Sequence, residues 1–300
     1  MRMIRRLALG ASVLALALSA CGPTGGSGAT IKIGSDGFDE ARVVAEIYAQ
    51  ALEAKGFTVD RAGIGLGKRA VTKAALESGQ IDLKPEYIGS GLVAYGGTSS
   101  NSSDTNRTGL QDKLTPLKIT VLNYTPAQDT NAFVVRKETA DQFHLTKMSD
   151  LAAVQDQLKW ALATDCPTNP LCAGALKDAY GINQPNATLL DACSGPMADA
   201  LLKKTVDIAE LCSTGPEIIT NGWVVLQDDK QTQPADNIAP IVRDDLLAKI
   251  DKQKFTDTLN AVSAKIDTKT LAQLYYDVAI SHKDLATVAK DWLKANGFVS

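Results

Sequence analysis

Short apolar runs alternate with longer amphipathic ones along most of the chain. Runs typical of β-strands fall at residues 30–34, 57–59, 81–83 and 119–122, and apolar residues at helical spacing mark 38–52, 70–77 and 87–95. Gly56 and Gly79 follow two of the helical stretches, where glycine suits a left-handed C-cap. Such alternation is typical of βα units around mostly parallel sheets, so the sequence predicts an α/β fold.

The alternation restarts after residue 149, which predicts a second lobe. Its strands are expected at 158–163, 188–190, 207–211 and 223–227. Extended crossovers are expected at 129–136 and 237–243, and a helical tail at 244–297 with caps at Asp251, Asp267 and Ser281. We therefore expect lobe 1 at 30–130 plus 239–300 and lobe 2 at 131–238. The polar run 98–106 is expected to form a surface loop.

The first residues have the features of an export signal. Three arginines precede an apolar run at 7–18, and Leu18-Ser19-Ala20-Cys21 fits the lipobox at which signal peptidase cuts before a cysteine. The apolar run is well short of the ~20 residues that span a bilayer. We expect 1–20 to be a lipoprotein signal peptide, Cys21 to carry the lipid, and the glycine-rich stretch 21–29 to be a flexible tether.

Charge and cysteine content agree with an exported protein. Without the signal arginines, 28 basic side chains face 34 acidic ones, which argues against nucleic acid or an anionic membrane face as partner. Four further cysteines predict two disulfides in an oxidising compartment: Cys166, Cys172, Cys193 and Cys212. Three pairings exist, and the turn-rich loop 167–171 favours Cys166 with Cys172, which leaves Cys193 with Cys212. No metal site is expected, because neither His144 nor His282 lies near these cysteines.

The sequence offers little from which to build an enzyme or a cofactor site. A nucleophilic triad would have to use His144 or His282, both expected on helix surfaces, and no Gly-x-Ser-x-Gly elbow occurs. The glycine-rich run 63–69 lacks phosphate-loop spacing, and it remains either a turn at the lip of a cleft or a plain structural turn. Tyr87 follows a predicted strand, where it either meets a ligand or packs under its own helix.

Several motifs together resemble one family of transport proteins. They are 34–38, 46–53, 75–83 leading to Pro85-Glu86-Tyr87, Asp129-Thr130 entering 134–138, Ser213-Thr214, and 237–240. They span most of the chain and resemble the substrate-binding proteins of glycine betaine/carnitine/choline-type ABC importers, the osmoprotectant importers. The resemblance implies a two-lobed, periplasmic-binding-protein-like (type II) fold with two hinge crossovers, no catalytic activity, and an ABC permease and its ATPase as partners.

The resemblance also implies a site for a small polar solute. Family members hold quaternary ammonium groups in cages of aromatic faces. Tyr87 matches one cage aromatic and Arg69 a common family arginine, whereas Asn131 and Cys212 stand where relatives often carry aromatic residues. The expected ligand-binding residues are Ser35, Phe38, Arg69, Tyr87, Asp129, Thr130, Asn131, Ser213 and Thr214.

The ligand is expected to be glycine betaine, choline, carnitine or a related compound, bound outside the cell membrane. Three alternatives stay open: the same importer role with a non-cationic ligand, a sensor lipoprotein without transport, and an exported hydrolase that uses one of the two histidines.

Overall fold

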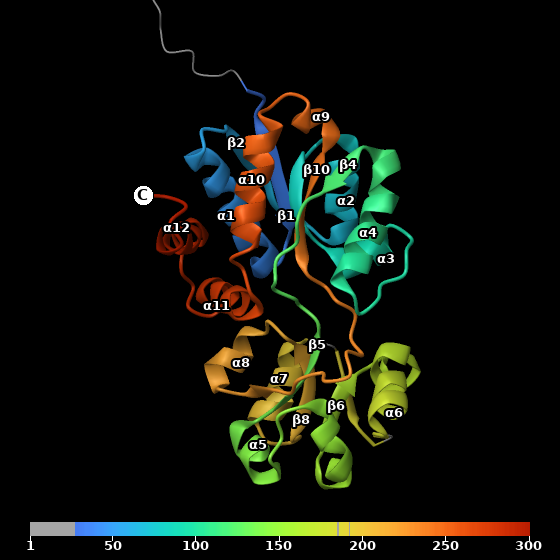
Figure 1. Ribbon diagram of the computed structural model, residues 1–300. Coiled ribbons are helices and arrows are strands. Elements are labelled where there is room, and N and C mark those ends of the chain that lie inside the picture. The colour runs from blue at the N-terminus through green and yellow to red at the C-terminus, as the bar shows by residue number, and fades with distance from the viewer. Residues whose placement is uncertain (1–27, 185, 192) are drawn as a thin grey trace, which may run out of the picture.

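The computed structural model describes residues 28–184, 186–191 and 193–300, which form two lobes, each built on a five-stranded sheet (Figure 1). The first sheet has the order β2-β1-β3-β10-β4, with β1 (Ile31–Asp36), β2 (Val59–Gly67), β3 (Leu83–Tyr87), β4 (Ile119–Val121) and β10 (Ile238–Arg243). The second has the order β7-β6-β8-β5-β9, with β5 (Asn131–Val135), β6 (Trp160–Ala163), β7 (Thr188–Leu190), β8 (Ile208–Cys212) and β9 (Val224–Val225).

Both sheets are mixed, and they follow one plan. In the first, β1 pairs in parallel with β2 and β3, while β10 is antiparallel to β3 and β4. In the second, β6 pairs in parallel with β7 and β8, while β5 is antiparallel to β8 and β9. The antiparallel strand in each sheet is the one that the chain enters after crossing from the other lobe.

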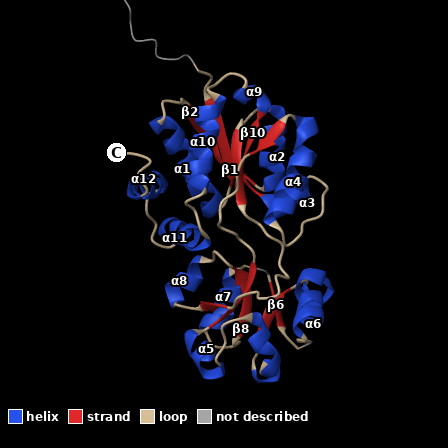
Figure 2. Ribbon diagram, viewed as in Figure 1, coloured by secondary structure: helices blue, strands red, loops and turns tan. Residues whose placement is uncertain are grey.

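Helices cover both faces of each sheet (Figure 2). The first lobe has α1 (Asp39–Ala54), α2 (Arg69–Ser78), α3 (Ile88–Ala94), α4 (Ser103–Leu114), α9 (Asp244–Leu247), α10 (Lys252–Ser263), α11 (Thr268–Ala279) and α12 (Leu285–Ala295). The second has α5 (Lys137–Phe143), α6 (Ala175–Tyr180), α7 (Gly195–Leu202) and α8 (Pro216–Asn221). Each lobe contains two apolar clusters, one per sheet face, because strands covered on both sides must bury side chains on both sides.

The chain crosses between the lobes twice, in residues 122–130 between β4 and β5 and in residues 226–237 between β9 and β10, and these two crossing segments lie side by side. Gln128 and Asn237 form an isolated antiparallel bridge. The side-chain amide of Asn237 donates to the carbonyl of Thr125 at 3.0 Å. Helix α11 of the first lobe also contacts α8 of the second. The lobes are therefore joined by two paired segments with one helix–helix contact beside them, an arrangement that permits hinge motion.

The predicted α/β fold with two crossovers is confirmed, and the predicted caps at Asp251 and Asp267 are confirmed too. Their carboxylates accept from the N–H groups of Lys254 at 3.1 Å and Thr270 at 2.7 Å. The prediction for Ser281 is wrong, because α12 begins after Asp284. The exact residue boundaries of the two lobes stay a prediction.

Two other local predictions are wrong because of where helices begin and end. The run 98–106 is not all loop, because the Ser102 side chain accepts from the N–H of Thr105 at 3.3 Å and starts α4. His144 and His282 are exposed but not on helix surfaces, since they have φ angles of 55° and 51° just beyond helix ends.

The glycine-rich run 63–69 is mostly strand rather than turn. Strand β2 continues to Gly67, and Gly63 lies opposite Gly34 of β1. A Cβ at Gly63 would lie 2.8 Å from the carbonyl oxygen of Ile33, so only glycine permits this close pairing. Pro85 is likewise inside β3, not beyond it, and pairs with Pro240 of β10. Neither proline has an N–H to leave unpaired.

The predicted signal peptide at 1–20, the lipid-carrying Cys21 and most of the tether at 21–29 lie outside the described residues. Within the described part of the chain, every helix is too short or too polar to cross a membrane.

Candidate functional site

A cavity of about 540 Å³ lies between the two lobes. It is lined by Arg69, Gly89, Ser90, Val93, Ala94, Ser99, Asp129, Thr130, Asn131, Asn169, Cys212, Gln233, Pro234 and Asp236. The lining comes from the start of α2, from both ends of α3 and the loop after it, from both crossing segments, and from the start of β5, the end of β8 and Asn169 in the second lobe. A ligand here would touch both lobes and both connections, so its binding would favour closure.

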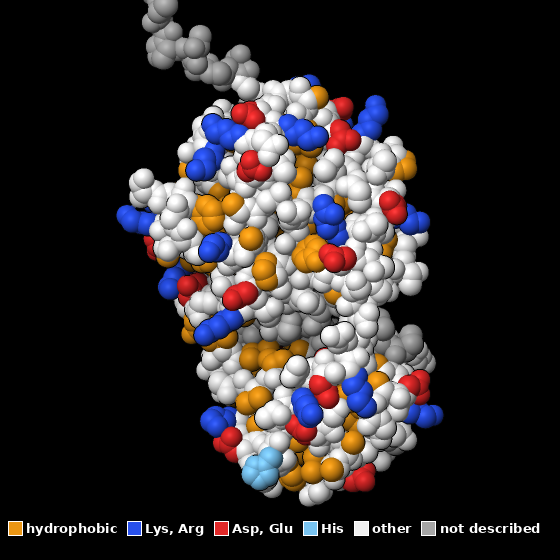
Figure 3. All heavy atoms as spheres, viewed as in Figure 1, with side chains coloured by type: hydrophobic (Ala, Val, Ile, Leu, Met, Phe, Trp, Pro, Cys, Tyr) orange, Lys and Arg blue, Asp and Glu red, His pale blue; other side chains and the backbone are white. Residues whose placement is uncertain are grey.

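Positive and negative side chains are interspersed over the visible outer face (Figure 3). The interlobe pocket differs, because acidic groups are concentrated in and behind it. Asp129 and Asp236 line the pocket, and Glu40 lies close enough to both for their negative charges to raise its pKa.

Asp236 is fixed to the N-terminus of α3. Its Oδ1 accepts from the N–H groups of Gly89 at 2.8 Å and Ser90 at 3.0 Å, and the Ser90 hydroxyl donates to Oδ2. A Cβ at Gly89 would lie 2.6 Å from the carbonyl oxygen of Ala235, so glycine is needed for this approach. Burial raises the pKa of Asp236, while its hydrogen bonds to Ser90 and Gly89 oppose that change.

Asp129 is held from the second lobe. The Thr214 hydroxyl donates to Asp129 Oδ1 at 2.9 Å. Burial raises the pKa of Asp129 to about 6; the Thr214 hydrogen bond lowers it and the negative charge of Asp236 raises it. A cation that entered the pocket would favour the ionised form of this carboxyl group.

Glu40, in the first turn of α1, lies behind the pocket and is 1% exposed. The Tyr87 hydroxyl donates to its Oε1, whereas Oε2 has no hydrogen-bond partner among the described residues. Burial raises the pKa of Glu40 to about 8, the charge of Asp129 adds to this shift, and the hydrogen bond from the Tyr87 hydroxyl opposes it. The site therefore contains a buried carboxyl group with one oxygen that has no hydrogen-bond partner among the described residues.

Tyr87 is the last residue of β3 and the N-cap of α3, and it is only 4% exposed. The ring of Phe38, which is 43% exposed, lies 5.9 Å from the Tyr87 ring at an angle of 37°. Of the two roles left open for Tyr87, the structure therefore favours packing, with its hydroxyl engaged by Glu40.

Arg69 is the positive group of the pocket lining. Its Nε donates to Glu86 Oε1 at 3.0 Å, and Glu86 is 1% exposed. Lys84, fully buried, donates to Glu86 Oε2 at 3.0 Å and to Asp36 Oδ1 at 2.9 Å. This buried network fixes the start of α2 and thereby orients the guanidinium group at the pocket.

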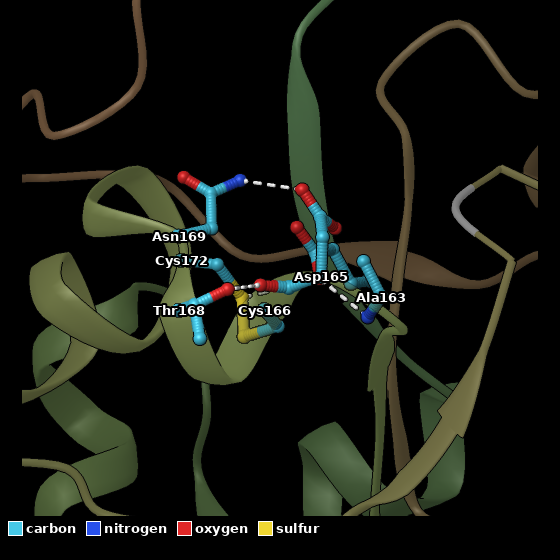
Figure 4. The surroundings of a disulfide bond; sticks show 7 residues. Ala163, Asp165, Cys166, Thr168, Asn169 and Cys172 are labelled. Carbon is cyan, nitrogen blue, oxygen red and sulfur yellow. Dashed lines mark hydrogen bonds between the residues drawn. A yellow bond between two sulfur atoms is a disulfide. The ribbon is translucent and has the colours of Figure 1, made fainter.

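Both predicted disulfides are present in the structure, with Cys166 joined to Cys172 and Cys193 to Cys212. In the first loop, the Asn169 amide donates to Asp165 Oδ2 at 3.1 Å (Figure 4). Asn169 also belongs to the pocket lining. Glu210 lies beside Cys166 and Cys172 in a group with metal-ligand spacing, but sulfurs in a disulfide bond do not serve as thiolate ligands. Cys212 ends β8 in the pocket lining.

Comparison with known proteins assigns the chain to a family. The model of the family described as the substrate-binding domain of ABC-type glycine betaine transport systems matches residues 29–295. The chain belongs to this family. Its members are extracytoplasmic solute-binding proteins rather than enzymes, so the class of protein predicted from the sequence is confirmed.

Individual relatives support the family assignment. The chain is 28% identical over 282 residues to the glycine betaine-binding protein YehZ of Escherichia coli strain K12, covering 89% of this chain and 91% of that protein. It is 25% identical over 294 residues to the carnitine transport binding protein OpuCC of Listeria monocytogenes serotype 1/2a, covering 94% and 93%.

Solved structures show the same fold. The crystal structure of a glycine betaine/carnitine/choline ABC transporter protein superposes with a TM-score of 0.80 at 24% identity, covering 89% of this chain and 99% of that chain. Apo YehZ from Escherichia coli superposes with a TM-score of 0.79 at 26% identity, covering 90% and 100%. The predicted type II binding-protein fold is thereby confirmed.

Within this family fold, the residues predicted to bind ligand separate into two groups. Arg69, Asp129, Thr130 and Asn131 line the pocket, whereas Ser35, Phe38, Tyr87, Ser213 and Thr214 do not. Ligand contact by any of them stays a prediction.

The hydroxyl groups in the second group bond to the protein itself. Ser35 donates to the carbonyl of Asp36 at 2.9 Å and accepts from the N–H of Gly65 at 2.9 Å. Ser213 donates to the carbonyl of Gln128 at 3.1 Å and accepts from the N–H of Thr130 at 3.0 Å. These two serines position the backbone around the pocket.

Glu40, Ser90 and Asp236 were not among the predicted site residues. Each had a positional signal, because Glu40 is two residues after Phe38, Ser90 three after Tyr87, and Asp236 directly before the 237–240 motif. Their neighbours belong to the family motifs, but only the folded structure places these three residues at the site.

Proposed function

We propose that this chain is the binding protein of an ABC importer and carries a small polar solute, a quaternary ammonium osmolyte or a close chemical relative of one. The observation that carries the proposal is the interlobe pocket, in which Asp129 and Asp236 lie with Arg69 between two lobes joined by paired crossings. Carboxylates suit the cationic end of such a solute, and a guanidinium suits its carboxylate end.

The names of relatives support this class of ligand. Glycine betaine and carnitine are named for the Escherichia coli and Listeria relatives, which cover nearly the whole chain. Both compounds are zwitterions with a permanent positive charge, and the pocket has groups of both signs.

The location proposed for the protein is the outer face of the cell membrane or the periplasm. Residues 1–20 would be removed at export, and lipid on Cys21 would anchor the chain through the tether at 21–29. Lobe 1 and lobe 2, as predicted at 30–130 plus 239–300 and at 131–238, would close on the solute by rotation about the crossings and present it to the permease.

A thermal-unfolding screen of the purified protein tests ligand binding. The panel contains glycine betaine, choline, carnitine, ectoine, amino acids and phenolic compounds. A ligand at 100 times its Kd adds about 2.7 kcal/mol of apparent stability, visible as several degrees in Tm. Stabilisation by an ammonium compound supports the proposal, whereas stabilisation only by a compound without positive charge would support an importer of another solute.

Uptake by cells separates an importer from a sensor. We expect deletion of the gene to abolish uptake of the stabilising compound, and reintroduction of the gene to restore it. Unchanged uptake in the deletion strain would contradict the importer role and support the sensor lipoprotein.

A further inference from the structure

The interlobe pocket lacks the aromatic faces that hold a quaternary ammonium group. No aromatic side chain is among the described residues that line it. Tyr87 is only 4% exposed and its hydroxyl is bonded to Glu40, while the lining residues Asn131 and Cys212 are not aromatic. A quaternary ammonium has no N–H to donate, so a carboxylate attracts its charge without forming a hydrogen bond, and ring faces strengthen its binding.

The pocket instead offers acidic hydrogen-bond acceptors. Asp129 and Asp236 line it, each positioned by hydrogen bonds from the protein. Charge-assisted hydrogen bonds from N–H groups are about twice as strong as neutral ones, and buried acceptors without donors are costly. Such a pocket favours an ammonium group that carries an N–H hydrogen-bond donor.

Resting on the proposed role as an importer's binding protein, we propose that the preferred ligand is a zwitterion whose ammonium group retains at least one N–H. That N–H donates to the Asp129–Asp236 side of the pocket, and the carboxylate of the ligand pairs with Arg69. Each methyl group that replaces an N–H removes a donor from Asp129 or Asp236, and none of the described residues that line the pocket offers a ring face in its place.

Calorimetric titration with an N-methyl series tests this preference on the unaltered protein. The probes are glycine betaine, N,N-dimethylglycine, sarcosine and glycine, which differ only in the number of N-methyl groups. We expect at least one N–H-bearing member to bind at least tenfold more tightly than glycine betaine. Tightest binding of glycine betaine, equal binding of all four, or no binding of any would overturn the inference.

A variant that adds an aromatic face to the pocket tests the inference from the opposite direction. Asn131→Tyr puts a ring in the pocket lining, and we expect it to move the preference toward glycine betaine by about tenfold. Asn183→Tyr, at an exposed position in the same lobe, is the matched control and should leave the order of affinities unchanged. A preference unchanged by Asn131→Tyr, in a variant whose thermal unfolding is cooperative, would contradict the inference.

The uptake assay keeps the two proposals separate. Loss of uptake on gene deletion, together with tightest binding of glycine betaine, would support the importer role and overturn the N–H preference. Unchanged uptake with an N–H preference would overturn the importer role alone.

Discussion

The backbone N–H of Asp129 donates to the carbonyl of Asp236 at 3.3 Å, which places two acidic residues side by side on the two crossing segments. Both side chains line the interlobe pocket. Burial raises the pKa of each, and the charge of Asp236 adds to the shift at Asp129. The hinge and the acidic site are thus the same part of the molecule, so a ligand that neutralises the carboxylates acts directly on the segments that must rotate.

The stability of the ligand-free protein should fall as pH rises from 5 to 8. The pKa of Glu40 is raised from 4.5 to about 8 by burial and by Asp129, so the folded state holds a proton that the unfolded chain has released in this range. Stability is then fully present below the unfolded pKa and declines toward the folded one, by at most ~1.4 kcal/mol per pH unit. Thermal unfolding at a series of pH values measures the slope.

Glu40→Gln supplies the control for this slope. The neutral amide cannot titrate, so the variant should unfold with a much flatter dependence on pH between 6 and 8, above the pKa of about 6 of Asp129. The same slope in wild type and Glu40→Gln would show that other groups cause the dependence.

Tyr87→Phe should destabilise the protein by about 1–3 kcal/mol, because it removes the hydroxyl that donates to the buried Glu40 and leaves the ring in place. Denaturant unfolding measures the loss. Tyr124→Phe removes a hydroxyl from an exposed bond to Asp104, 2.7 Å long, and should cost clearly less. Equal losses in the two variants would contradict the role assigned to the Tyr87–Glu40 bond.

Gly89→Ala should weaken both stability and ligand binding. Its Cβ would lie 2.6 Å from the Ala235 carbonyl and 3.1 Å from Asp236 Oδ1, so the second crossing has to move away from α3. We expect at least a tenfold loss of affinity for the ligand found in the thermal screen. Gly195→Ala, where no atom lies within 4 Å of the new Cβ, should bind normally. Normal binding by Gly89→Ala would show that this close approach is not required.

The two disulfides should differ in their effect. Cys193 and Cys212 are 19 residues apart and Cys166 and Cys172 are 6 apart, so chain entropy predicts losses of about 3 and about 2 kcal/mol on replacing each pair with serine. Cys212 also lines the pocket beside Asn131, its partner in the β5–β8 pairing. Replacing Cys193 and Cys212 should therefore weaken ligand binding as well. Denaturant unfolding measures the loss of stability in each double variant, and ligand titration measures the change in affinity. A larger loss of stability on replacing Cys166 and Cys172 would contradict the role of loop length.

Much of the fold could be predicted from the sequence because its signals are local. Alternating apolar runs located most strands, and aspartates at 251 and 267 correctly marked helix starts. The errors occurred where tertiary pairing decides the outcome. Gly63 was expected in a turn and Pro85 just past the end of a strand. Each belongs to a strand, because Gly63 pairs with Gly34 and Pro85 pairs with Pro240 on the neighbouring strand.

The site was harder to predict, since its chemistry arises between distant segments. Asp129 was identified from its motif, but Asp236 and Glu40 became significant only when folding placed them near it. The burial of Tyr87 under Glu40 and Phe38 could not be deduced from spacing either. A motif indicates that a residue is near a site, whereas its exposure determines whether it can touch a ligand.

The measurement that tests the central claim most directly is calorimetric titration of wild type, Asp129→Asn and Asp141→Asn with the ligand identified by the thermal screen. Asp129 lines the interlobe pocket, whereas Asp141 is an exposed residue of α5. We expect Asp129→Asn to lose at least tenfold in affinity, about 1.4 kcal/mol, and Asp141→Asn to bind as wild type does. Unchanged affinity in a folded Asp129→Asn variant would contradict the claim that the solute binds between the lobes.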